Sequence, residues 1–212
     1  MLALECGLRY SELQRALDFR VSRLHGCLVS HEHMDHARAA KEMARAGVDI
    51  YASVGTLTAL ALCGTRFKAV KAHEEFSVGS WRVYPFDVVH DAAEPLGFFL
   101  IHPAGWRVLY ATDTAYLSYR FEGMTHILVE TNYEAEALRE GVTEGRIPAV
   151  VKRRITQSHF SLEHVKGFLQ ANDLSRVQEI WLLHISNSNA DASQFKKEIQ
   201  ELTGKQVYVG ER

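Results

Sequence analysis

Cysteine is scarce in this sequence, and the three residues present are scattered at Cys6, Cys27 and Cys63. None of them forms a Cys-x-x-Cys pair, and their number is too small for a disulfide framework. We therefore expect three reduced cysteines that belong to the core. This absence excludes the small, disulfide-stapled class of secreted domains.

Long apolar runs and an excess of positive charge are also lacking. No stretch approaches the roughly 20 apolar residues that a membrane helix needs, and the first residues do not read as a signal peptide. We therefore expect a soluble, cytoplasmic protein with no membrane contact. The formal net charge is −2, so any binding of nucleic acid would have to depend on a local basic patch.

Linkers are absent as well: no low-complexity tract, repeat or Pro/Gly/Ser-rich stretch divides the 212 residues. One domain over residues 1–212 is the simplest interpretation. Apolar, β-rich runs predict strands at 26–30, 81–89, 97–102, 106–111 and 126–130. Apolar spacings of three and four predict helices at 37–46, 54–63, 133–140, 162–171 and 191–203. This order favours an α/β protein in which helices cover two sheets.

Histidine is abundant, with 11 residues, and its placement matters more than its number. The short stretch "SHEHMDH" holds His31, His33, Asp35 and His36 directly after an apolar strand. Imidazole and carboxylate groups suit Zn²⁺, Mn²⁺ or Fe, so one segment could serve two adjacent metals. The alternative is a solvated loop in which Asp35 caps a helix.

Three further polar residues follow apolar strands in the same way: His90, Asp113 and His184. Taken singly, each histidine fits a strand-end residue with an ordinary hydrogen bond. Taken together, their shared position predicts that four strands deliver ligands to one edge.

The motifs "HEHMDH", "VVHDAAEPLGF", "YATDT" and "LLHIS" occur in an order and spacing that resemble the metallo-β-lactamase-fold hydrolase superfamily, over essentially the whole chain. The resemblance implies an αββα sandwich with a two-metal site, holding Zn²⁺ or alternatively Mn²⁺ or Fe. It further implies that one ion binds His31, His33 and His90, that the other binds Asp35, His36 and His184, and that Asp113 bridges both. Family members usually begin with a β-hairpin before the strand matching "LALECGL", so the resemblance implies either a shortened N-terminal hairpin or a first sheet that lacks an edge strand. A homodimer would cover an exposed sheet edge of this kind.

The segments "LALECGL", "VETNY" and "KRRITQSHFSLEH" resemble the short bacterial and phage exonuclease-like members and those related to ribonuclease Z. This branch implies a phosphodiesterase or nuclease acting on DNA or RNA through a metal-bridging hydroxide that Asp35 helps to orient. In this branch His159 would stabilise the transition state or protonate the leaving oxygen. Zinc β-lactamases of the commonest type carry cysteine where Asp113 stands, which disfavours antibiotic hydrolysis.

Several roles outside the metal ligands stay open at this point. The basic triplet Lys152, Arg153 and Arg154 is the candidate grip on a nucleic-acid backbone, although such triplets often form a solvated face. Glu130 and Asn132 are candidates for orienting the ligating histidines. Asp91 could pair with an imidazole or cap a turn. A small ester, lactone or β-lactam hydrolase, and a non-catalytic metal-stabilised module, remain as alternative functions.

Overall fold

The computed structural model describes residues 1–210, which form two compact units. Unit 1 comprises residues 1–87 and 92–98, and unit 2 comprises residues 88–91 and 99–210 of the described chain. The strands belong to two sheets, a four-stranded sheet of order β1-β2-β3-β4 and a seven-stranded sheet of order β11-β10-β9-β8-β7-β6-β5. The predicted α/β architecture of two sheets flanked by helices is confirmed.

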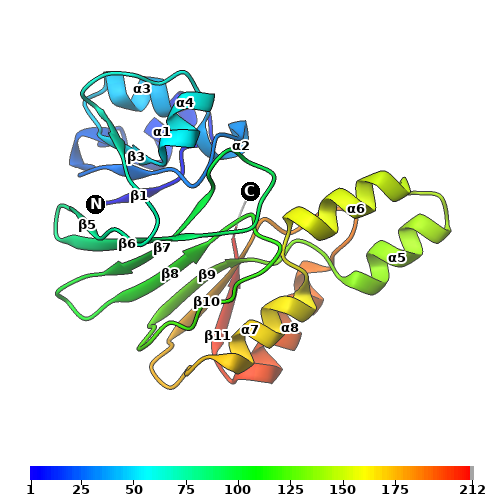
Figure 1. The fold of residues 1–212 in the computed structure, drawn as a ribbon. Helices are drawn as coiled ribbons and strands as arrows, with labels where there is room; N and C mark the ends of the chain where they lie inside the picture. Colours follow the sequence, from blue (N-terminus) through cyan, green and yellow to red (C-terminus); the bar gives the residue numbers. More distant parts are fainter. Residues whose placement is uncertain (211–212) are drawn as a thin grey trace. The chain divides into compact units, whose positions relative to one another are not determined.

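Unit 1 is built around the four-stranded parallel sheet (Figure 1). Its strands are short: β1 (Ala3–Leu4), β2 (Cys27–Leu28), β3 (Ile50–Ala52) and β4 (Phe67–Ala69). Its helical elements are α1 (Tyr10–Ala16), η1 (Val21–Arg23), α2 (Met34–Ala37), α3 (Ala40–Arg45) and α4 (Val54–Ala59). The core of this unit is apolar and well buried, since Cys27, Ile50 and Met43 are each at most 1% exposed.

The remaining strands of the first half are β5 (Phe76–Val78), β6 (Trp81–Asp87) and β7 (Leu96–Ile101). The strands β5 and β6 pair antiparallel, with Val78 opposite Trp81. Gly79 makes the tight turn between them with φ of 57°, a conformation that an L side chain rarely adopts.

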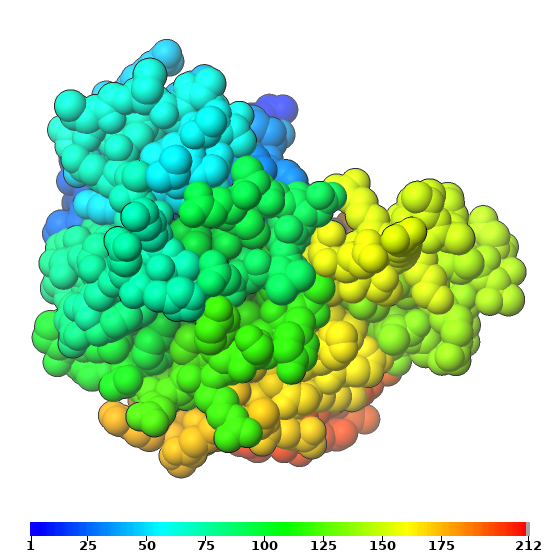
Figure 2. All heavy atoms as spheres, viewed as in Figure 1, coloured from blue at the N-terminus to red at the C-terminus, as the bar shows by residue number. Residues whose placement is uncertain are grey.

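Unit 2 contains four parallel strands, β8 (Arg107–Ala111), β9 (His126–Glu130), β10 (Glu179–Leu183) and β11 (Gln206–Val209). Helices α7 (Leu162–Ala171) and α8 (Ala192–Thr203) lie side by side along these strands (Figure 1). Helices α5 (Ala135–Thr143) and α6 (Ala149–Ser158) form a hairpin whose atoms project beyond those of α7 in Figure 2. A small apolar cluster around the fully buried Leu138 holds this hairpin together.

Two helices begin or end at residue types that favour a helix end. Ser161 caps α7 by accepting a hydrogen bond from the His164 amide, and the helix spans the predicted residues 162–171. Gly204 ends α8 in the left-handed conformation with φ of 66°.

Other predicted bounds were wrong. The helix predicted at 37–46 is two helices, α2 and α3, because the backbone at Ala39 leaves helical geometry (φ −94°, ψ 11°). The helix predicted at 54–63 ends at Ala59, two residues before Ala61 with its positive φ of 50°. Within residues 1–210, none of the helices has the length and apolar character that a bilayer-spanning segment requires.

Candidate functional site

In unit 1 the candidate ligands lie on the segment that follows β2. His33 occupies the N-cap position of α2, so His31 precedes the helix while Asp35 and His36 lie within it. His31 and His36 are buried, with exposed fractions of 1% and 6%. The Asp35 side chain is 62% exposed, which leaves its carboxylate accessible from solvent.

The imidazoles of this segment converge. The Nε2 atom of His31 lies 3.0 Å from Nδ1 of His33, and Nδ1 of His31 lies 2.9 Å from Oγ of Ser30. The rings of His31 and His36 are 4.2 Å apart between centroids. Two imidazole nitrogens that face each other at 3.0 Å can share an N–H hydrogen or bind the same metal ion.

A neighbouring loop holds this segment in place. The carboxylate of Glu5 accepts hydrogen bonds from the Ser30 amide at 3.2 and 3.3 Å and lies 3.8 Å from Nδ1 of His36. A Cβ atom at Gly7 would lie 1.5 Å from the Asp35 carbonyl oxygen, so only glycine permits this close approach. Neither role was predicted from the sequence, although both residues lie in the "LALECGL" stretch.

In unit 2 two candidate ligands stand just beyond strand ends. Asp113 follows β8 and His184 follows β10, and both have positive φ, 41° and 51°. Such a backbone costs about 1–3 kcal/mol per residue and is concentrated at functional sites. The Nδ1 atom of His184 lies 2.8 Å from Oδ1 of Asp113, whose exposed fraction is 2%.

Glu130, at the end of β9, is the shared hydrogen-bond acceptor of this group. It is fully buried, and its Oε1 atom accepts from Nδ1 of His159 at 2.7 Å and from Nδ1 of His184 at 2.9 Å. Its Oε2 atom accepts from the amides of Thr114 and Phe160 at 2.9 and 3.0 Å. The carboxylate therefore fixes the orientation of both imidazoles and directs the Nε2 side of each ring away from Glu130.

His90 is oriented by a backbone carbonyl instead. Its Nδ1 atom donates to the Ser158 carbonyl at 2.7 Å, and its Nε2 atom lies 3.5 Å from Oδ2 of Asp113. Burial lowers the pKa of His90 below its ordinary value, against the opposing effects of the Ser158 carbonyl and of Asp113. The neutral imidazole that results is the form that binds a metal.

The donors of unit 2 fit a divalent metal ion. One ligand atom from each of Asp113, Glu130, His159 and His184 lies within 4.8 Å of the others. Oxygen and imidazole nitrogen are the donors that Zn²⁺, Mn²⁺ and Fe accept, and both histidines have the carboxylate partner that ligating imidazoles usually have. The cluster is therefore compatible with a divalent metal site.

The basic triplet lies on α6, and its members differ in their surroundings. Arg153 and Arg154 line a depression of about 400 Å³ together with His90, whereas Lys152 is not among the lining residues. Arg154 also lies 3.7 Å from the carboxylate of Asp91. Asp91 thus pairs with a guanidinium. The sequence had suggested an imidazole partner or a turn cap for this residue.

Two other residues have roles that the structure makes plain. Asn132 donates from Nδ2 to the His184 carbonyl at 2.8 Å, so it supports the backbone of a candidate ligand. Glu32 accepts a hydrogen bond from the Ala93 amide at 2.8 Å. It therefore ties the ligand segment to the loop before β7.

Comparison with known proteins gives the family. The model of the beta-lactamase superfamily domain matches residues 6–185. Among curated proteins, the exodeoxyribonuclease YycJ of Bacillus anthracis is 29% identical over 199 residues, which cover 86% of this chain and 72% of that protein.

Solved structures show the same fold. The metallo-β-lactamase fold protein YhfI from Bacillus subtilis has a TM-score of 0.74 at 15% identity, covering 99% of this chain and 84% of that one. The short form of human tRNase Z has a TM-score of 0.61 at 12% identity, covering 99% and 85%. With these strands, this placement of histidines and the match over residues 6–185, the chain belongs to the beta-lactamase superfamily and has the metallo-β-lactamase fold.

Proposed function

We propose that this protein is a metal-dependent nuclease that cleaves phosphodiester bonds in DNA. The observation that carries the proposal is the cluster of Asp113, Glu130, His159 and His184, in which a buried carboxylate orients two imidazoles beside a second carboxylate. The exodeoxyribonuclease name of the Bacillus anthracis relative favours DNA as the substrate. RNA is the other phosphodiester polymer that the same chemistry would serve.

We further propose two divalent ions, with Zn²⁺ as the first candidate and Mn²⁺ or Fe as alternatives. The proposed ligands, which the family resemblance implies, are His31, His33, Asp35, His36, His90, Asp113 and His184. Two such ions, when bound, would lower the pKa of a water molecule toward neutrality and offset negative charge on the attacked phosphate. The burial of His31, His36 and Asp113 supports this role, because the three side chains are shielded from solvent where a metal ion would replace water as their partner.

His159 is the proposed group that handles the leaving oxygen. Its Nδ1 atom is held by Glu130 at 2.7 Å, and its side chain is 18% exposed, so it is reachable at one face only. A ring oriented in this way can give a proton to a leaving oxygen or hydrogen-bond to a phosphate oxygen. Asp35, with its exposed carboxylate, is the proposed acceptor of the proton from the attacking water.

The test is hydrolysis of end-labelled DNA by purified protein loaded with Zn²⁺ or Mn²⁺, with labelled RNA and bis(p-nitrophenyl) phosphate alongside. The proposal expects DNA cleavage that chelation abolishes and that Asp113→Asn lowers by orders of magnitude. A control variant, Asp173→Asn, changes a fully exposed carboxylate whose hydrogen-bond partner is Ser175, and should keep full activity. Protein that contains metal and cleaves none of the three substrates would refute the proposal.

Three further expectations stay predictions: one domain over residues 1–212, a homodimer and a cytoplasmic location. The oligomeric state can be measured by light scattering on the purified protein. Arg153 and Arg154, the exposed basic side chains of α6, remain candidates for contact with the DNA backbone.

A further inference from the structure

Helix α6 presents one stripe of side chains to the depression beside His90. Val150, Arg153, Arg154 and Gln157 follow the spacing i, i+3, i+4 and i+7, which places them on one face of a helix. All four line the depression of about 400 Å³. The helix ends at Ser158, whose carbonyl binds His90 at 2.7 Å.

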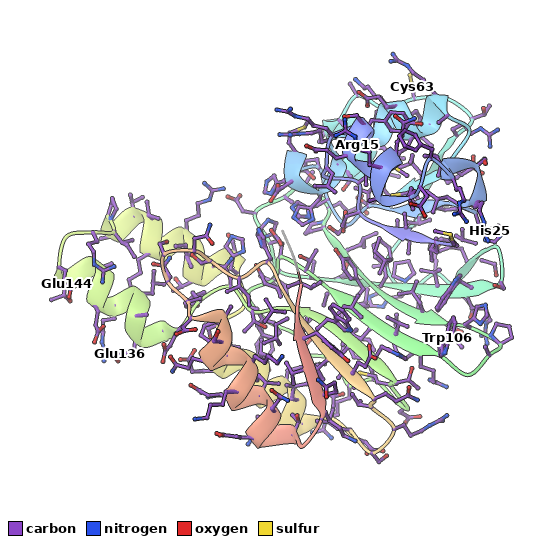
Figure 3. The ribbon with its side chains drawn as sticks, turned by 180° about the vertical axis from the view of Figure 1, so that it is seen from behind. Arg15, His25, Cys63, Trp106, Glu136 and Glu144 are labelled. Carbon is purple, nitrogen blue, oxygen red and sulfur yellow. The ribbon has the colours of Figure 1, made fainter. Side chains whose placement is uncertain are left out.

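The cations of the hairpin are not equivalent. Arg139 pairs with Glu136 and Arg146 pairs with Glu144, and both of these acids lie on the α5 side of the hairpin in Figure 3. The Arg154 guanidinium lies 3.7 Å from the carboxylate of Asp91. The Arg153 guanidinium, by contrast, has no ion pair or hydrogen bond anywhere within residues 1–210, and the residue is exposed.

We infer that Arg153, with Gln157 beside it, binds a backbone phosphate of single-stranded DNA that flanks the phosphate to be cleaved. This inference rests on the proposed nuclease function and names the part of the protein that selects polymeric substrate. An unpaired guanidinium offers five donors in a fixed fork that suits two phosphate oxygens, and the Gln157 amide adds another donor on the same stripe.

The position of Arg153 along α6 indicates a phosphate that flanks the one to be cleaved. Arg153 precedes Ser158 by five residues, which corresponds to about 7.5 Å along the helix axis. This separation favours a phosphate on a neighbouring nucleotide over one at His90 or His159. The consequence is a dependence on substrate length: a strand of several nucleotides reaches Arg153, and a small phosphodiester does not.

Lys152 is the matched control. It adjoins Arg153 in the chain and carries the same charge, but it is not among the residues that line the depression. General attraction between a basic helix and DNA would respond to the loss of either residue. Binding in the depression would respond to the loss of Arg153 alone.

The experiment measures binding of a fluorescent phosphorothioate dodecanucleotide to the metal-loaded protein over a range of salt concentrations, since this backbone keeps its charge and resists hydrolysis. Arg153→Ala should weaken binding about fivefold and lower the slope of log K against log salt by about 0.7, the value for one phosphate contact on a single strand. Lys152→Ala should leave the slope unchanged, and Arg153→Lys should restore it. Gln157→Glu, which places a negative charge in the same depression, should weaken binding as well.

Hydrolysis separates this inference from the proposed function. Arg153→Ala should raise KM for the unmodified dodecanucleotide and leave KM for bis(p-nitrophenyl) phosphate unchanged. If Arg153→Ala and Lys152→Ala bind the strand equally, or if the wild-type protein does not bind it, the inference is overturned even when both substrates are cleaved. If the strand binds through Arg153 but neither substrate is cleaved, the inference stands and the proposed function fails.

Discussion

Replacing Glu130 with glutamine tests the role of its carboxylate as the shared acceptor in the candidate site, because the two side chains have almost the same shape. The carboxylate accepts four hydrogen bonds, two at each oxygen, from Thr114, Phe160, His159 and His184. The amide of glutamine can accept at only one end. Its NH₂ group must face either two backbone amides or two imidazole N–H groups, so two donors lose residue 130 as their acceptor in either orientation.

The expected cost follows from these contacts. A hydrogen bond to a charged group contributes about 1.5–3 kcal/mol, so the loss of two would cost about 3–6 kcal/mol. Removing a buried charge offsets part of this cost, because that charge no longer has to be desolvated. We therefore expect Glu130→Gln to lower the free energy of unfolding by about 3 kcal/mol and to weaken metal binding by about 10- to 100-fold.

Urea denaturation followed by circular dichroism measures the first quantity, and competition with a chromophoric chelator measures the second. Glu136→Gln is the matched control, because Glu136 is half exposed and pairs with Arg139 at the surface. Its loss should cost less than about 1 kcal/mol. The reasoning is refuted if Glu130→Gln is as stable as this control and binds metal with wild-type affinity.

Three other perturbations should have distinct outcomes. Gly7→Ala forces a Cβ atom to within 1.5 Å of the Asp35 carbonyl, so we expect a loss of about 1–3 kcal/mol together with weaker metal binding by titration calorimetry; an alanine variant with wild-type affinity would contradict this. Chelation should lower Tm in a scanning fluorimetry assay, and added Zn²⁺ should restore it. A Tm that changes with neither treatment would count against a bound metal. Hydrogen bonds from Lys166 and Gln194 lower the pKa of Glu198. The contribution of this carboxylate to stability, below about 1 kcal/mol because the pair is only partly buried, is present at neutral pH and lost as the pH falls through the lowered value. Glu198→Gln should therefore destabilise the protein at neutral pH and not in acid, as urea unfolding at the two pH values would show.

The parts of the fold that the sequence predicted well are those with strong local signals. Helix α7 has a capping serine followed by apolar residues at helical spacing, and its observed bounds are the predicted ones. The strands β8 and β9 are compact apolar runs bounded by polar residues, and both were predicted to within one residue. Each of these elements has its pattern within its own residues, so no distant contact was needed to find it.

The parts that the sequence missed have no such signal. Strands β1, β3 and β4 are two or three residues long, which is too short for an alternating pattern to emerge. Helix α6 was interpreted only as a basic stretch, because most of its residues face solvent and only Ser158 is buried. Its helical form appears from its packing against α5 through Ile147 and Ile155.

The candidate site shows the same division. The histidines and Asp113 are conspicuous in the sequence because they follow strands, whereas their supports are not. The Ser158 carbonyl that holds His90 is a backbone atom and leaves no trace in residue identity. Glu130 was suspected as an orienting group, but its four donors come from three separate segments, and only the folded chain brings them to one carboxylate.

The most direct test of the central claim is the rate at which chelated protein regains cleavage of end-labelled single-stranded DNA as Zn²⁺ or Mn²⁺ is added back. The account predicts no cleavage without metal, full recovery at a stoichiometry of two ions per chain, and no recovery for Asp113→Asn. Cleavage that persists in excess chelator, or wild-type protein that binds two ions and leaves DNA intact, would contradict it.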